Sequence, residues 1–374
     1  MTETTKLPDF DKTIDALIAG TPLSTDTLQY FLETVPLNRL IEGAHRVTES
    51  CASTTFNTCA IINAKADGCS CDCAWCAQSR HWNSTPAETS LVSEEIAELG
   101  ADRVHRHGIR RYSLVTAGRK LSPRVTREAT DLLVSLHRKF PDMELCASFG
   151  LMNEKELTAL KDAGLIRYHC NLETSDAHFR KVCTTHTRDD KIATLKAARE
   201  AGLELCSGGL FGIGEAEADR IELAETLRDL EIPSIPLNFL SPIAGTPLAD
   251  QLPLSDEEIL RTAVIFRLLN PTAYLRLAGG RNRLTEEGVE KIMFAGVNSA
   301  IMGDFLTTQG SSLKADVAAA QEAGWELENS MHEALRVGFP EVETTDNKTC
   351  RPTMCAVPNT KPVPIKVVGK KAQL

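Results

Sequence analysis

The spacing of apolar residues changes along the chain. In the first fifty residues, apolar positions such as Ile14, Leu17 and Ile18 recur at helical spacing, and two prolines break the run into separate helices. Short β-rich runs then begin to alternate with longer amphipathic ones. The two patterns predict an N-terminal helical extension over residues 1–50 and a domain of alternating strands and helices over residues 51–340.

The second region repeats one local unit, in which a helix ends at an Ala-Gly pair and leads directly into a strand. Gly164 and Gly202 both follow such helices, and Gly after the last helical turn is a C-cap signal. Eight strands of this kind predict a (β/α)8 TIM-type barrel, with an open doubly wound sheet as the alternative. The predicted strands lie near residues 58–64, 110–116, 143–149, 166–172, 203–210, 234–240, 273–278 and 297–302.

Composition narrows the class of protein. No apolar run approaches a membrane span, and Met1 to Pro8 lacks the basic region and apolar run of an export signal. We therefore expect a cytoplasmic protein, whose twelve cysteines are thiols or metal ligands rather than disulfides. The net charge of −10 argues against nucleic acid as a partner. The proline-containing polar segment 341–374, which carries Cys350 and Cys355, predicts a flexible C-terminal tail.

Three cysteines after the first predicted strand have the spacing of an iron–sulfur site. Cys69, Cys73 and Cys76 are separated by three and by two residues, and the next cysteine is Cys146. Simple electron carriers usually close a cluster with four thiolates, so one iron here must take a ligand from elsewhere in the fold or from a small molecule. A zinc site is the alternative, with His81 as the nearby imidazole. The loop follows a barrel strand, where such barrels place their active sites.

The other predicted strands carry polar residues that are unusual in a plain barrel core. A buried polar side chain needs partners, so several of them facing one cavity indicate a polar ligand. Four side chains from alternate strands build each interior layer of such a barrel. One predicted layer, on the first, third, fifth and seventh strands, would form a second metal–sulfur site from Cys59, Cys146, Cys206 and Arg276. The further polar candidates are Ser113, Asn171, Glu173 and Asn238.

These residues resemble the biotin synthase family of radical S-adenosylmethionine enzymes. The resemblance implies that the three loop cysteines hold a [4Fe-4S] cluster, whose open iron binds S-adenosylmethionine and whose electron releases a 5'-deoxyadenosyl radical. It implies dethiobiotin as substrate, sulfur donated by an auxiliary cluster, a flavodoxin- or ferredoxin-type electron donor and a homodimer. The resemblance covers residues 57 to 330 and rests on Cys69-x-x-x-Cys73-x-x-Cys76, Asn171-Leu-Glu-Thr-Ser175, Cys206-Ser-Gly-Gly-Leu-Phe-Gly-Ile-Gly-Glu215, Ile235-Pro-Leu-Asn-Phe239, Gly245-Thr-Pro-Leu248 and Tyr274-Leu-Arg-Leu-Ala-Gly-Gly-Arg281.

The resemblance also assigns contacts to single residues. By similarity, Trp75 packs near the adenine of S-adenosylmethionine, Asn171 and Glu173 meet its ribose, and Arg199 lies near its carboxylate. Asn171 and Asn238 are implied to face dethiobiotin. Conversion of dethiobiotin to biotin is therefore the leading prediction. The alternatives are a related radical enzyme of the maturase or mutase type acting on another small molecule, and an electron carrier or metal-storage protein.

The chain departs from the family pattern at the auxiliary cluster. The family's [2Fe-2S] cluster takes cysteines from the second, third and fifth strands and an arginine from the seventh, but the second strand here offers Ser113. Serine ligates iron poorly beside a softer thiolate. Cys59 stands where the family usually has serine. Our hypothesis is that Cys59, Cys146, Cys206 and Arg276 surround a [2Fe-2S] or a variant larger cluster, with Ser113 as the competing ligand.

The fourth predicted strand differs from the family as well. His169 and Cys170 replace the more usual asparagine-containing entry. If Asn171 and Glu173 point inward, strand alternation also points His169 inward. There it either lines the substrate pocket or is a hydrogen-bonded core histidine. Cys170 and Cys183 are expected to be packing residues, and Cys183, just past this strand, is also a weaker reserve ligand.

Overall fold

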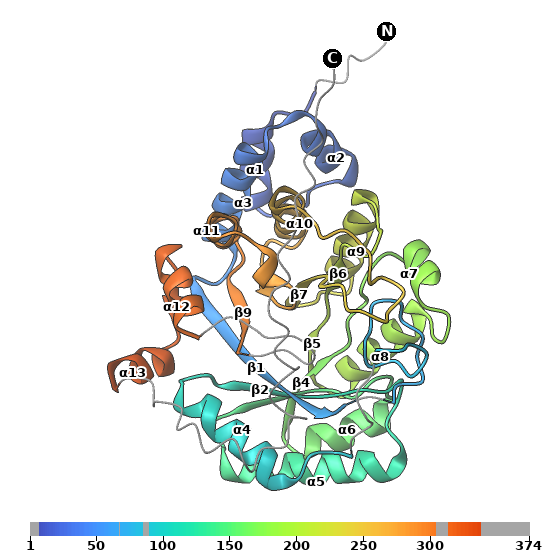
Figure 1. Ribbon diagram of the computed structural model, residues 1–374. Coiled ribbons are helices and arrows are strands. Elements are labelled where there is room, and N and C mark those ends of the chain that lie inside the picture. The colour runs from blue at the N-terminus through green and yellow to red at the C-terminus, as the bar shows by residue number, and fades with distance from the viewer. Residues whose placement is uncertain (1–6, 67, 85–89, 304–312, 338–374) are drawn as a thin grey trace, which may run out of the picture. The chain divides into compact units, whose positions relative to one another are not determined.

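The computed structural model describes residues 7–66, 68–84, 90–303 and 313–337, in which strands and helices alternate (Figure 1). The described strands are β1 (Thr55–Lys65), β2 (Arg111–Thr116), β3 (Glu144–Ser148), β4 (Leu165–His169), β5 (Glu204–Cys206), β6 (Gly209–Phe211), β7 (Ser234–Phe239), β8 (Tyr274–Leu277), β9 (Ser299–Met302) and β10 (Glu326–Leu327). The described helices are α1 (Phe10–Ile18), α2 (Thr25–Thr34), α3 (Leu37–Cys51), α4 (Glu94–Arg106), α5 (Pro123–Lys139), α6 (Glu154–Asp162), α7 (Asp176–Val182), α8 (Arg188–Glu200), α9 (Glu217–Asp229), α10 (Asp256–Leu269), α11 (Glu286–Phe294), α12 (Leu313–Glu322) and α13 (Asn329–Val337), with a short 3-10 turn at Arg281–Arg283.

The strands of the described chain form one parallel sheet that closes on itself. The order is β10-β1-β2-β3-β4-β5-β7-β8-β9, and β9 also pairs with β1, which completes the barrel. Strand β6 pairs with β7 beyond the point where β5 pairs with it, so β5 and β6 are one barrel strand interrupted at Ser207 and Gly208. Strand β10 pairs only with the first residues of β1. The predicted (β/α)8 barrel is confirmed, and the open doubly wound sheet is excluded.

The sequence signals explain the ends of these helices. Ser122 caps α5 by accepting a hydrogen bond from the amide of Val125, and Asn153 and Glu156 form a capping box at α6. Gly164, which follows α6, has a positive φ of 98°. A left-handed residue at this position ends the helix and turns the chain into the next strand, as the Ala-Gly repeat predicted.

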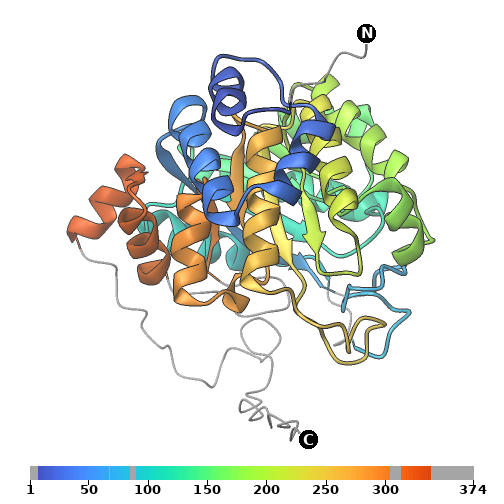
Figure 2. The ribbon, with the colours of Figure 1, turned by 90° about the horizontal axis from the view of Figure 1, so that it is seen from above.

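The barrel core lies between the strands and the surrounding helices. The predicted N-terminal helical extension is present as α1 to α3, in which α3 packs against α10 and α11 on the outside of the barrel and α1 and α2 pack against α3 (Figures 1 and 2). Among the described helices, none combines the length and the hydropathy that a membrane span requires. The predicted tail 341–374, with Cys350 and Cys355, lies outside the described residues.

Because all barrel strands are parallel, the loops that follow them gather at one mouth. The loop after β1, which carries the three-cysteine motif, lies beside the loop after β7 in both views (Figures 1 and 2). The contact is close at Gly245, where an added Cβ would stand 2.5 Å from the carbonyl oxygen of Asn83. Gly245 also has a positive φ of 86°, so a side chain there is opposed by both backbone conformation and space.

Candidate functional site

A cavity of about 440 Å³ opens at the carboxyl ends of the strands. This volume lies in the range of sites for small ligands and cofactors. The cysteine loop contributes Cys69, Cys73, Trp75 and Cys76 to its lining. The barrel strands contribute, among others, Ile61, Ser113, His169, Pro236, Asn238 and Ile301.

The three loop thiols all line the cavity. Each thiolate ligand of an iron–sulfur cluster holds a different iron, so three of them leave one iron of a four-iron cluster open to another ligand. Hydrogen bonds from Cys71 lower the pKa of Cys69 to about 6, toward the thiolate form that ligates metal.

Asp72 ties the cysteine loop to the segment that follows α7. Its Oδ1 accepts hydrogen bonds from the amides of Thr184 and Thr185, at 2.9 and 3.1 Å. Burial alone raises the pKa of Asp72, but these bonds and those from both threonine hydroxyls hold it well below its usual range. With the Asp72 hydrogen bonds in place, the sulfur atom of Cys183 lies 3.7 Å from that of Cys73. Their hydrogen bond lowers the pKa of Cys183 to about 4 and raises that of Cys73.

Asn171 and Glu173 lie at the cavity with Lys191 of α8. Lys191 Nζ donates to the carbonyl oxygen of Asn171 at 2.8 Å and lies 3.9 Å from the Glu173 carboxylate. Glu173 has a φ of 71°, in the left-handed region, which non-glycine residues seldom occupy outside functional sites. Burial raises the pKa of Glu173, against the opposing charge of Lys191. The three groups offer a cation, a carboxylate and an amide to one ligand.

The structure does not bring Arg199 to this cavity. Arg199 is exposed in the last turn of α8, where its guanidinium donates to the carbonyl oxygen of Leu230. In a βα unit the helix runs back toward the amino ends of the strands, so its last turn lies far from the mouth. Lys191, in the first turn of the same helix, is a cation that lines the cavity and lies beside Glu173. The sequence could have indicated Lys191, because residues in the first turn of a helix that follows a barrel strand lie near the mouth.

Asn238 lies on the cavity wall with its amide group fixed by backbone. Its Nδ2 donates to the carbonyl oxygen of Gly209 at 3.0 Å, and its Oδ1 accepts from the amide of Gly279 at 3.0 Å. One side chain thus joins the ends of β6, β7 and β8. Asn238 lines the cavity, where a residue that contacts the substrate is expected to lie. Its hydrogen bonds to the barrel wall are a structural role that the sequence did not indicate.

The predicted interior layer lies beneath this cavity. Cys59, Cys146, Cys206 and Arg276 are between 0 and 2% exposed. On β1 and β3 the cavity-lining residues, such as Ile61, lie nearer the carboxyl end of the strand than the cysteines do, so the cysteines lie deeper in the barrel. Ser113 lines the cavity and pairs in register with Cys146 on the neighbouring strand.

The charges around these thiols are balanced by arginine. Arg276 Nη2 donates to Asn57 Oδ1 at 2.6 Å, and Nη1 donates to the carbonyl oxygens of Asn57 and Ala300. Burial lowers the pKa of Arg276, and the neighbouring Cys59 and Cys206 oppose this shift. Burial alone raises the pKa of Cys206, but His169, Arg167 and Arg276 outweigh it and bring it to about 6. Burial raises the pKa of Cys59 and of Cys146, so Cys206 is the one of the three thiols whose anionic form its neighbours favour.

Several buried polar atoms in this interior lack partners among the described residues. They are Ser113 Oγ, His169 Nε2, Ser207 Oγ and Arg276 Nε. Buried polar atoms are almost always satisfied in native proteins, so a cluster of exceptions points to a bound polar group. Ser113 Oγ, which lies in register with Cys146, and Arg276 Nε, beside Cys59 and Cys206, are the two that lie next to the buried thiols.

Known proteins match most of this chain. The Radical SAM superfamily profile matches residues 64–227, and the profile of the Biotin and Thiamin Synthesis associated domain matches residues 236–326. The biotin synthase of Porphyromonas gingivalis is 43% identical over 290 residues, covering 78% of this chain and 88% of that protein. The chain belongs to the biotin synthase family. The biotin synthase of Brachyspira hyodysenteriae is 41% identical over 319 residues, covering 85% of this chain and 95% of that protein.

Solved structures outside the biotin synthase family share the same fold. Methylornithine synthase has a TM-score of 0.71 at 18% identity and covers 86% of this chain and 99% of its own. The FeFe-hydrogenase maturase HydG from Carboxydothermus hydrogenoformans has a TM-score of 0.72 at 17% identity and covers 85% and 79%, respectively. At such identities the likeness shows the barrel fold alone.

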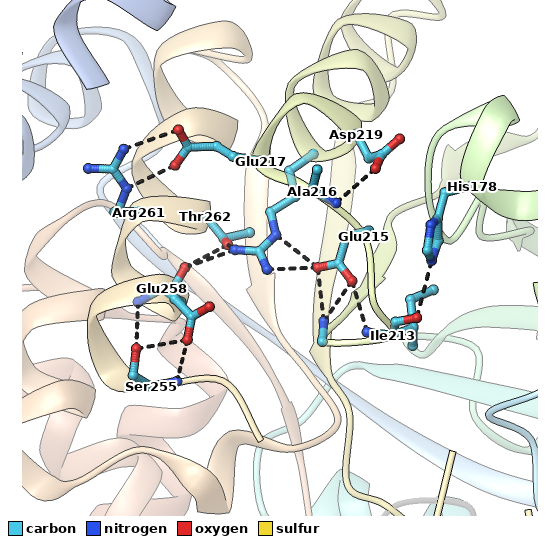
Figure 3. Close-up of polar contacts among 12 residues, drawn as sticks. His178, Ile213, Glu215, Ala216, Glu217, Asp219, Ser255, Glu258, Arg261 and Thr262 are labelled. Atoms are coloured by element: carbon cyan, nitrogen blue, oxygen red, sulfur yellow. Dashed lines mark hydrogen bonds and ion pairs between the residues drawn. The ribbon is translucent and has the colours of Figure 1, made fainter. Parts of the chain in front are cut away.

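The loop after β6 in this biotin synthase family member is held by a buried carboxylate that sequence reasoning missed. Glu215 accepts hydrogen bonds from the amides of Gly212 and Ile213 and pairs with Arg220 at 2.8 Å (Figure 3). His178 Nε2 meets the carbonyl oxygen of Ile213 at 3.1 Å and ties α7 to the same loop. The loop follows β6, whose first residue Gly209 pairs with Glu173, so Glu215 stabilises a segment next to the cavity wall.

Proposed function

We propose that this chain converts dethiobiotin to biotin as a radical S-adenosylmethionine sulfurtransferase. Membership of the biotin synthase family supports the reaction class. The observation that carries the proposal for this chain is the presence of two separate groups of thiols, one on the cysteine loop at the mouth of the cavity and one, Cys59, Cys146 and Cys206, buried in the barrel beneath it. Sulfur insertion needs both a radical source and a sulfur source.

The mouth of the cavity is the proposed site of the radical source. Cys69, Cys73 and Cys76 would hold the [4Fe-4S] cluster, and Lys191 would pair with the carboxylate of S-adenosylmethionine in place of Arg199. When bound, these cofactors supply a carbon radical that removes hydrogen from an unactivated carbon. Trp75, which packs at 6.4 Å from Phe179 ring to ring, presents an aromatic surface to an adenine at the same mouth.

The rest of the cavity would orient the substrate and exclude water. Asn171 and Glu173 carry polar groups suited to the ribose hydroxyls of S-adenosylmethionine, and Asn238 faces the place proposed for dethiobiotin. The surrounding barrel wall protects a reactive intermediate from solvent. The positions of these groups on rigid strand ends support precise placement of the target carbon.

For the sulfur source, we propose an auxiliary cluster held by Cys59, Cys146 and Cys206, of the [2Fe-2S] or a larger type. The burial of Cys59 and the mutual influence of Cys59, Cys206 and Arg276 on their pKa values support a shared site. Ser113 is the competing ligand, since its unpartnered hydroxyl lies beside Cys146.

An anaerobic turnover assay tests the function. Reconstituted protein would receive dethiobiotin, S-adenosylmethionine and a reduced flavodoxin, and 5'-deoxyadenosine, methionine and biotin would be measured. We expect biotin to form only with dethiobiotin present. Cleavage of S-adenosylmethionine without biotin would instead favour a related radical enzyme with another substrate, and no cleavage would exclude both.

Iron and sulfide counting with Mössbauer spectroscopy tests the auxiliary ligands. Cys59→Ala should lose the auxiliary iron and retain the [4Fe-4S] signal, whereas Ser113→Ala should retain both. Cys51→Ala, which removes a thiol at the end of α3, is the matched control. An intact auxiliary cluster in Cys59→Ala refutes this ligand set.

The family resemblance supports three further proposals, namely a cytoplasmic location, a homodimer, and a flavodoxin- or ferredoxin-type electron donor. Light scattering on the purified chain measures the mass of the assembly. Replacing flavodoxin by ferredoxin or by dithionite in the turnover assay shows which donor supports biotin formation.

A further inference from the structure

Cys183 and His186 face the cysteine loop although neither belongs to its motif. The sulfur of Cys183 lies 3.7 Å from that of Cys73 and 3.3 Å from Nδ1 of His186. The three ligand atoms all lie within 4.8 Å of one another. Among the described residues, no other three cysteine, histidine or acidic side chains meet this criterion.

These spacings match the edges of a mononuclear tetrahedral site. Two thiolates on one zinc ion at ~2.3 Å are about 3.8 Å apart, and a thiolate and an imidazole nitrogen at ~2.0–2.1 Å are about 3.5 Å apart. The observed 3.7 and 3.3 Å are close to both. Thiolates that hold different irons of a cluster lie farther apart than two that share one ion. The geometry therefore suits one ion rather than an edge of the cluster.

The protein holds these ligands in place by contacts that do not involve a metal. The Asp72 carboxylate binds the amides of Thr184 and Thr185, which lie between Cys183 and His186. The ring of Phe179 meets the His186 imidazole edge-on, with centroids 5.4 Å apart. Because these contacts already hold the ligand side chains in place, an ion can bind without the entropy cost of ordering them.

We propose that the cluster-free chain binds one thiophilic divalent cation of the zinc type through Cys73, Cys183 and His186, with water as the fourth ligand. Both sulfurs bind as thiolates, so the proton that the thiol pair shares is released on binding. This site goes beyond the proposed function and does not depend on it. Its consequence does rest on that function, because Cys73 is also a proposed ligand of the [4Fe-4S] cluster. The ion and the cluster then exclude each other, and zinc would block cluster assembly.

Cobalt titration of the cluster-free full-length chain tests the site. Under anaerobic conditions, Co²⁺ should give the intense near-ultraviolet band of a cobalt–thiolate bond and the visible bands of tetrahedral cobalt, at one ion per chain, and Zn²⁺ should displace it. Cys183→Ser and His186→Ala should each weaken binding by more than about 100-fold. Cys170→Ser removes a thiol that lines the same cavity and should bind as the unaltered chain does.

Two results overturn the site. One is unchanged cobalt binding in either Cys183→Ser or His186→Ala. Two variants are used so that a loss of binding caused by misfolding of one of them does not decide the test. The other is an equal loss of binding in Cys69→Ser and Cys76→Ser, which would place the ion on the three-cysteine motif itself. Circular dichroism of each variant separates a lost ligand from a lost fold.

Cluster reconstitution with iron and sulfide tests the competition. One equivalent of Zn²⁺ should slow the growth of the cluster absorbance in the unaltered chain and have much less effect in Cys183→Ser. Cluster assembly that ignores bound zinc overturns the sharing of Cys73. The anaerobic biotin assay is carried out on zinc-free protein, so failure there is distinguishable from failure of the zinc site.

Discussion

Replacing Glu215 by glutamine removes one charge of a buried ion pair while keeping the size of the side chain. Glu215 is 1% exposed and Arg220 is 8% exposed, with a separation of 2.8 Å. The same carboxylate accepts hydrogen bonds from the amides of Gly212 and Ile213. Figure 3 shows this group at the centre of contacts between the loop after β6 and helix α10.

The magnitude follows from the donors that converge on Glu215. A glutamine offers one acceptor oxygen and a new NH₂ donor to three donor groups, so at least one N–H faces another N–H. Loss of one partner of a buried pair costs about 3–5 kcal/mol of folding free energy. Arg220 keeps the carbonyl oxygen of Glu258 and the hydroxyl of Thr262 as acceptors, so we expect the lower end, about 3 kcal/mol.

Glu217→Gln is the matched control. Glu217 pairs with Arg261 at 2.8 Å, but the two side chains are 37 and 22% exposed. Partly exposed pairs are screened by water and contribute about 0.2–1 kcal/mol. The same chemical change two residues away should therefore cost less than a third as much as Glu215→Gln.

Urea unfolding of the cluster-free chain, followed by circular dichroism, measures both variants against the unaltered chain. S-adenosylmethionine binding to the reconstituted chain is a second readout, since Glu215→Gln should loosen the loop beside Glu173 and Glu217→Gln should not. Equal destabilisation by the two variants, or a loss below about 1 kcal/mol for Glu215→Gln, would refute the reasoning from burial.

Three further changes are predicted. Burial raises the pKa of Asp219, but hydrogen bonds from a serine hydroxyl and a backbone amide outweigh it and hold the pKa below its usual value. The contribution of Asp219 to the free energy of unfolding is therefore present above about pH 4 and is lost as the pH falls below that. In unfolding titrations at several pH values, Asp219→Asn should reduce this loss of stability in acid by up to about 1 kcal/mol. Gly280→Ala places a Cβ 1.8 Å from a backbone oxygen and should destabilise the fold by more than Gly202→Ala, which meets nothing within 4 Å and costs about 1 kcal/mol through its positive φ. Lys191→Met should weaken S-adenosylmethionine binding by about 10–100-fold in calorimetry, while Arg199→Met should leave it unchanged.

Most of the fold could be predicted from local sequence patterns, and the features that could not be predicted depend on tertiary contacts. The Ala-Gly helix ends and the β-rich runs are short-range signals, so the strand positions were predictable. The break between β5 and β6 was not, because it depends on packing against another strand. A Cβ on Gly208 would stand 1.9 Å from the carbonyl oxygen of Pro236, which is remote in sequence.

The site shows the same division. Strand alternation was enough to expect Cys59, Cys146 and Cys206 inside the barrel, where they are buried. The choice of Arg199 rested on resemblance, whereas the structure places Arg199 in the last turn of α8, away from the cavity lining. The place of Lys191 in the first turn of α8 is a signal that the sequence carries, but its contact with Glu173 becomes visible only when the helix is placed in the fold.

Arg276 could serve the proposed auxiliary cluster either as a metal ligand or as a positive charge beside it. Its terminal nitrogens already donate to Asn57 and Ala300, so ligation of a metal through them would break bonds to the barrel wall. Among the described residues its hydrogen-bond partners are all neutral, and a buried cation of this kind needs a nearby negative charge. The Glu328 carboxylate, which accepts from Asn57 Nδ2, is one such charge, and a thiolate on Cys206 or a cluster bound beside it would be another. We infer that Arg276 serves as the counter-charge of the auxiliary cluster and that Cys59 supplies the bond. Arg276→Lys should then retain more auxiliary iron than Cys59→Ala, and the reverse order in the iron analysis would contradict this division of roles.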